Sequence, residues 1–145
     1  MFGFGKSYDD EYLELYEHLT QLRGMKPAYA KSFLNAYKKS IRKMFVQGKK
    51  RLEGLKIVSD VEMEIMRMLH PGHECDLVLV EQAYAAYLLD LRHGKHVGTQ
   101  VEKAIWAILY NKLDLVLSFD KAFANYIQEN QEKEFPGLFE EVFES

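Results

Sequence analysis

Apolar residues recur at spacings of three and four along most of the 145-residue chain. This spacing places them on one face of an α-helix, so it predicts a series of amphipathic helices. The predicted helices cover residues 8–22, 27–54, 59–70, 75–92, 101–110 and 114–131, followed by a short terminal helix over 138–143.

Local signals at the helix ends support these boundaries. Residues 59–62 and 99–102 each have the pattern of a capping box, in which two side chains satisfy backbone groups at a helix start. Pro71 disfavours helical backbone in the residue before it, so we expect the third helix to end at His70.

Residues 113–119 also fit a strand, because apolar and polar residues alternate there. No second segment could pair with that strand, so its backbone groups would stay unsatisfied, and we assign it to the helix over 114–131. Leu and Ala number 28, against 17 for Val, Ile and Thr, and unbranched side chains keep more rotamer freedom in a helix. We predict an all-α fold, a compact single domain over 1–145 with six to seven helices.

The sequence also indicates where the protein works. A single cysteine gives no disulfide framework, and the first residues lack the pattern of a secretory signal. No stretch of 18 apolar residues is present, so we expect no membrane span. We therefore expect a cytoplasmic protein.

Charge is distributed unevenly along the chain. Residues 26–56 contain ten basic residues and one acid, a net charge of +9, so the remainder carries −12 of the total −3. The acids concentrate in the first predicted helix and in the last 20 residues or so. On a straight helix at about 100° per residue, the basic side chains form two neighbouring rows opposite the apolar stripe: Lys31, Lys38, Arg42 and Lys49 in one, and Lys39, Lys43 and Lys50 in the other.

We call these seven residues the basic face. Because closely spaced like charges repel one another, a negative group is expected to oppose them. It could be an acidic helix of the same chain, an acidic protein partner, or a nucleic acid or anionic membrane surface. A pI near 6.0 argues against nucleic acid, as do the aromatic residues of this segment, most of which are assigned to the buried stripe.

His70, His73 and Cys75 lie together in the segment HPGHEC and are candidate metal ligands. A second pair, His93 and His96, follows the fourth predicted helix. That helix holds the two pairs about 27 Å apart at ~1.5 Å per residue, so they cannot share one metal within a chain. The first group offers at most three ligands around a proline-glycine turn, so we predict no bound metal or other cofactor.

No pattern typical of an enzyme emerges. Cys75 has acidic neighbours on both sides, which oppose activation of a thiol, and we expect an inert, buried cysteine. The sequence predicts a small non-catalytic protein-binding or regulatory module that contacts an acidic partner through the basic face, or uses its acidic C-terminal segment. The alternatives are a helical nucleic-acid-binding regulator that uses the same basic face, and an enzyme of unrecognised type.

Overall fold

The computed structural model describes residues 8–41 and 74–144, and the prediction of a helix over 59–70 lies outside this part. The described residues are mainly helical, with one isolated antiparallel bridge between Met25 and Phe143, so the all-α prediction is confirmed. The labelled elements are α1 (Tyr8–Glu17), the π-helical turn η1 (His18–Leu22), α2 (Pro27–Ala36), α5 (Glu74–Leu89), the 3₁₀ turn η3 (Leu91–His93), α6 (Gln100–Asn111), α7 (Leu113–Phe119), α8 (Lys121–Glu134) and α9 (Leu138–Val142).

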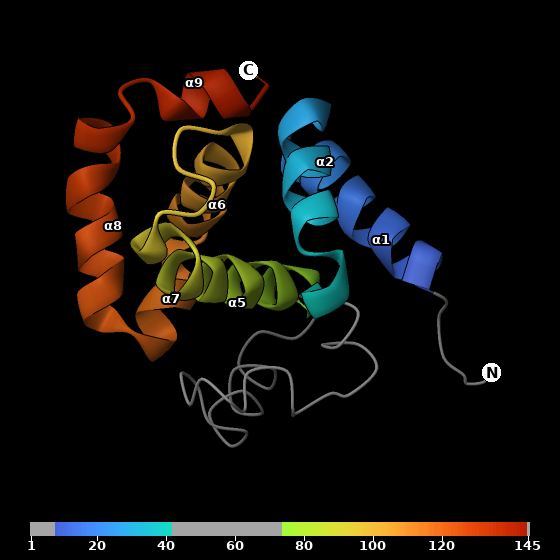
Figure 1. Ribbon diagram of the computed structural model, residues 1–145, viewed down its shortest axis with the longest axis horizontal. Helices are drawn as coiled ribbons and strands as arrows, with labels where there is room; N and C mark the ends of the chain where they lie inside the picture. The colour runs from blue at the N-terminus through green and yellow to red at the C-terminus, as the bar shows by residue number, and fades with distance from the viewer. Residues whose placement is uncertain (1–7, 42–73, 145) are drawn as a thin grey trace.

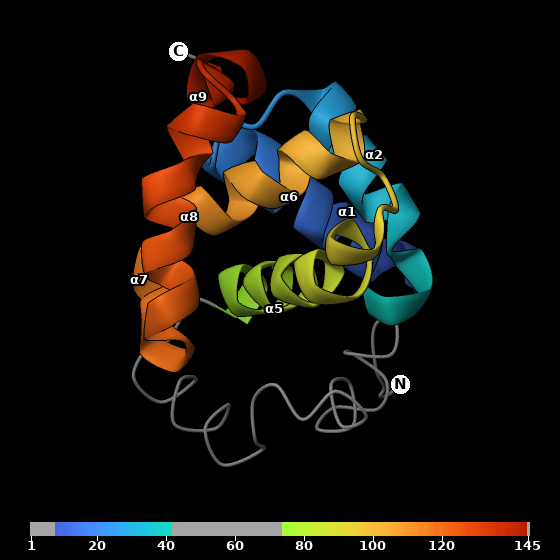
Figure 2. The ribbon, with the colours of Figure 1, turned by 60° about the vertical axis from the view of Figure 1, so that its left-hand side comes forward.

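The helices form three layers. α5 and α6 lie in the middle, α1 and α2 on one side, and α7 and α8 on the other (Figures 1 and 2). Residues 104–109 of α6 are all buried, because α6 packs against α2, α5, α8 and α9. Each fully buried leucine or isoleucine here contributes about 1.5–3 kcal/mol.

The first helix is not one continuous α-helix over 8–22, as the apolar spacing predicted. α1 ends at Glu17, and the next five residues form a π-turn, in which the Arg23 amide donates to the carbonyl of His18 at 3.1 Å. Gly24 then adopts a φ of 79°, a left-handed conformation that glycine accepts at little cost. The chain turns there towards α2.

The prediction of a single helix over 27–54 is also wrong within the described part. α2 ends at Ala36, and Tyr37 leaves the helical region with φ −119° and ψ 23°. Its carbonyl then accepts from the Ile41 amide at 2.9 Å, which opens a new turn. The Tyr37 ring is buried and its hydroxyl donates to Asp90 at 2.8 Å, so side-chain packing holds this break.

The helix predicted over 114–131 is divided at Asp120. This residue has φ −150° and ψ 86°, and its carboxylate accepts from the Phe123 amide at 3.0 Å. It thus caps α8, while its second oxygen accepts the Tyr84 hydroxyl. An internal cap ends one helix and begins the next without proline or glycine.

The C-terminal segment closes the fold over the junction between η1 and α2 (Figure 1). The Lys26 amide donates to the carbonyl of Val142 at 2.8 Å, and the Glu144 amide donates to that of Gly24 at 2.7 Å. Leu138 and Val142 are buried in the core. This acidic segment is therefore part of the packed structure along 138–143.

Candidate interaction surface

Three residues of the basic face, Lys31, Lys38 and Lys39, lie within the described part, and all three are exposed. Arg42, Lys43, Lys49 and Lys50 lie outside it. Because α2 ends at Ala36, Lys31 and Lys38 belong to different helical segments. The straight-helix geometry that defined the two rows therefore does not hold across Tyr37.

Two of these lysines nevertheless occupy equivalent positions beside α1. The ammonium of Lys31 lies 5.8 Å from the centroid of the Tyr16 ring, and that of Lys38 lies 5.4 Å from the centroid of Tyr12. Such cation–π contacts contribute about 0.5–1 kcal/mol each at exposed sites. The Tyr12 hydroxyl donates to Asn35 at 3.0 Å, which fixes α1 against α2 between the two lysines.

The ion pairs in the described part use other cations. They join Asp76 to His18, Arg23 and Lys112, Glu141 to Lys103, and Asp114 to Lys112. Within residues 8–41 and 74–144, none of these pairs involves a lysine of the basic face. The tyrosine rings orient Lys31 and Lys38 without neutralising them.

The acidic C-terminal segment instead contacts the start of α2 and α6. Glu141 accepts from the Tyr29 hydroxyl at 2.5 Å and from the Lys103 ammonium at 2.7 Å. These hydrogen bonds lower the pKa of Glu141, and the bond to Glu141 raises the pKa of Tyr29 to about 12. The Lys26 ammonium donates to the carbonyl of Glu140 at 3.4 Å. The acidic segment therefore contacts the N-terminal end of α2, and within the described residues it forms no ion pair with a lysine of the basic face.

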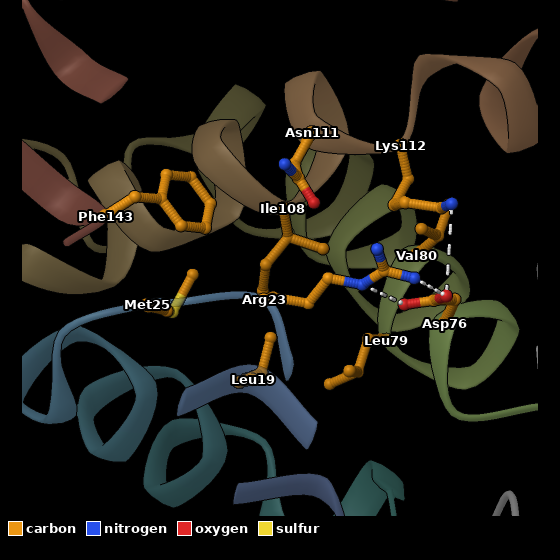
Figure 3. Close-up of a pocket in the computed structure, with 10 residues that line it drawn as sticks. All are labelled: Leu19, Arg23, Met25, Asp76, Leu79, Val80, Ile108, Asn111, Lys112 and Phe143. Atoms are coloured by element: carbon orange, nitrogen blue, oxygen red, sulfur yellow. Dashed lines mark hydrogen bonds and ion pairs between the residues drawn. The ribbon is translucent and has the colours of Figure 1, made fainter. Parts of the chain in front are cut away.

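A buried ion cluster forms where η1 meets α5, and the sequence did not point to it (Figure 3). Asp76, only 3% exposed, accepts from His18 at 2.7 Å and from the Nε of Arg23 at 3.1 Å. The second Asp76 oxygen meets an Arg23 terminal nitrogen and lies 3.9 Å from the Lys112 ammonium. Burial alone would raise the pKa of Asp76, but the bonds from His18 and Arg23 outweigh it and hold that pKa well below its ordinary value.

The π-turn makes this convergence possible. His18 and Arg23 are five residues apart, a spacing that puts side chains on different faces of an α-helix at about 100° per residue. A π-turn has more residues per turn, so the fifth residue returns towards the face of the first. The two side chains can therefore reach a single carboxylate.

A small cavity and an open groove border this region. The cavity lined by Arg23, Asp76, Asn111, Lys112 and apolar side chains has a volume of about 10 Å³, enough for about one water molecule. An open groove of about 410 Å³ lies outside it, lined by Glu14, Glu17, His18, Gln21, Leu22 and Cys75.

Of the three candidate metal ligands in HPGHEC, the structure describes only Cys75. His70 and His73 lie outside the described residues. Cys75 is half-buried, with its Sγ 3.8 Å from a carboxylate oxygen of Glu14, the reverse of the cationic surroundings that activate a cysteine. Among the residues that the structure describes, no three His, Cys, Asp or Glu side chains are grouped to hold a metal ion.

Within the same residues, no helix is both long enough and apolar enough to cross a membrane. The chain matches no protein-family model, no curated protein and no solved structure.

Proposed function

We propose that this protein is a non-catalytic binding module whose basic face contacts an acidic segment of a partner protein. The proposal rests on one observation: Lys31 and Lys38 are exposed, held over the rings of Tyr16 and Tyr12, and absent from the ion pairs of the described part. Oriented cations that form no ion pair within the described residues are suited to attract an anionic partner and to set its register.

A protein partner is favoured over nucleic acid because of how the rings are used. Proteins that bind single strands stack bases on aromatic faces. Here a lysine ammonium lies over each of the two rings, so that face of Tyr12 or Tyr16 is occupied. A carboxylate can pair with the ammonium without displacing it from the ring.

A defined probe tests the proposal. We expect a fluorescein-labelled peptide of alternating glutamate and leucine to bind the wild-type protein, and a glutamine–leucine peptide to bind much more weakly. The double variant K31E/K38E should weaken binding of the acidic peptide by about tenfold or more, since charge reversal turns attraction into repulsion. The control is K121E/K133E, which reverses two exposed lysines of α8 and should bind as wild type does.

Thermal unfolding distinguishes loss of binding from loss of structure. K31E/K38E removes two exposed cation–π contacts, which together contribute about 1–2 kcal/mol, so its melting temperature should fall by about 3–7 °C and the protein should stay folded at the assay temperature. Equal binding by K31E/K38E and K121E/K133E would refute the proposal. Tighter binding of a random-sequence DNA duplex than of the peptide, lost in K31E/K38E, would replace the protein partner with nucleic acid.

A further inference from the structure

The loop between α5 and α6 lies beside α2 on the side away from α1. The Ser32 hydroxyl of α2 donates to the Gln100 side chain at 2.9 Å. At the other end of α2, Tyr37 donates to Asp90 at 2.8 Å, and its ring meets His96 edge-on at 5.9 Å between centroids. Figure 2 shows this loop running along the same side of the molecule as α2.

The loop carries cationic and titratable side chains to the end of α2. His93 and Lys95 are exposed and lie between Asp90 and His96, the two residues that contact Tyr37. Lys38 and Lys39 directly follow Tyr37 and are exposed as well. Among the described residues, Asp90 accepts the Tyr37 hydroxyl at this end of the loop, and at the other end Glu102 accepts from the Gly98 amide at 2.8 Å. Segments more than 50 residues apart in the sequence therefore meet at Tyr37, and in each of them exposed basic residues adjoin the contact in sequence.

The loop holds a fixed conformation. The Asp90 carbonyl accepts from the amides of His93 at 3.0 Å and Lys95 at 2.9 Å, and the His96 carbonyl accepts from the Thr99 amide at 3.1 Å. His96 adopts a φ of 66°, a left-handed conformation that costs a residue with a Cβ about 1 kcal/mol. Such strain persists where the surroundings over-determine the backbone, so Lys95 is presented from a preorganised loop.

We propose that the contact surface crosses α2 and continues onto this loop, so that Lys95 and His93 bind the same acidic segment as Lys31 and Lys38. This inference rests on the proposed function and specifies its partner: an acidic peptide that lies across α2 and reaches the loop. A preorganised charge strengthens such binding because little conformational entropy is lost on association.

The test uses the full chain and the glutamate–leucine peptide described above. K95E and H93E should each weaken binding by about three- to tenfold, whereas the single control K121E should leave it unchanged. Circular dichroism should give the wild-type spectrum for all three, because these side chains are exposed. The triple variant K31E/K38E/K95E should bind more weakly than K31E/K38E.

The outcomes separate the two proposals. If K95E and H93E bind as K121E does while K31E/K38E loses affinity, the extension onto the loop is overturned and the proposed function stands. If K31E/K38E also binds as wild type does, both are overturned.

Discussion

The buried carboxylate of Asp76 provides the sharpest test of the structure. In the variant D76N, the asparagine side chain fits the same space but carries no charge, so Arg23 and Lys112 lose their common anion. Their side chains are only 25% and 14% exposed, and water therefore compensates them poorly. Removing one partner of a buried ion pair costs about 3–5 kcal/mol, and we expect about 3 kcal/mol because Arg23 retains some access to solvent.

The matched control is D114N. The carboxylate of Asp114 lies 3.8 Å from the same Lys112 ammonium but is 63% exposed, and exposed pairs contribute about 0–1 kcal/mol. Urea unfolding followed by circular dichroism should give D76N a free energy of unfolding about 3 kcal/mol below wild type, and D114N one within about 1 kcal/mol of it. For a domain of this size, 3 kcal/mol lowers the melting temperature by roughly 10 °C.

The contribution of Asp76 to the free energy of unfolding should depend on pH, and the direction of that dependence can be predicted. Because the folded-state pKa of Asp76 is lowered from 3.8, its contribution is present above about pH 3.8 and is lost as the pH falls below it. The difference between wild type and D76N should therefore shrink by about 1.4 kcal/mol per pH unit in that acid range. A D76N protein as stable as D114N at pH 7, or a difference that grows in acid, would refute the buried ion cluster.

Two other contacts can be tested in the same way. D120A removes both the cap of α8 and the acceptor of the Tyr84 hydroxyl. We expect urea unfolding to give this variant a free energy of unfolding about 2 kcal/mol below wild type. The control D114A removes an exposed aspartate and should cost far less. Y29F removes the hydrogen bond to Glu141 and should cost about 1 kcal/mol at neutral pH. Because the pKa of Tyr29 is raised to about 12, that contribution is lost as the pH rises from 10 to 12, so unfolding curves of Y29F and wild type should converge there; a constant difference would contradict this assignment.

The helical class and much of the core were predictable because they depend on periodicity. Phe33, Leu34 and Ile41 lie in the core as their spacing predicted. The breaks at Tyr37 and Asp120 were missed, since neither contains proline or glycine. An aspartate at position 120 can cap a helix by accepting a hydrogen bond from the amide three residues later, at Phe123. The same residue type is also tolerated on an exposed helix face, so the sequence alone did not distinguish the two.

The ion cluster was beyond sequence reasoning for a different reason. His18 and Arg23 are 58 and 53 residues from Asp76, and their five-residue spacing fits no α-helical face. One signal was available: α5 is apolar around much of its circumference, so an acid such as Asp76 within it must be paired once the helix is buried. That argument shows the need for a cation without showing which residue supplies it.

The π-turn over His18–Leu22 has a consequence for how the chain tolerates changes in length. A π-turn contains one residue more than the α-helical turn it replaces. Deleting one of its residues, such as Gln21, would leave His18 and Arg23 four residues apart, a spacing that lies on one face of a regular α-helix, so both side chains would still point towards Asp76. The turn can therefore lose one residue and become an ordinary α-helical turn while the carboxylate keeps both of its partners from this segment.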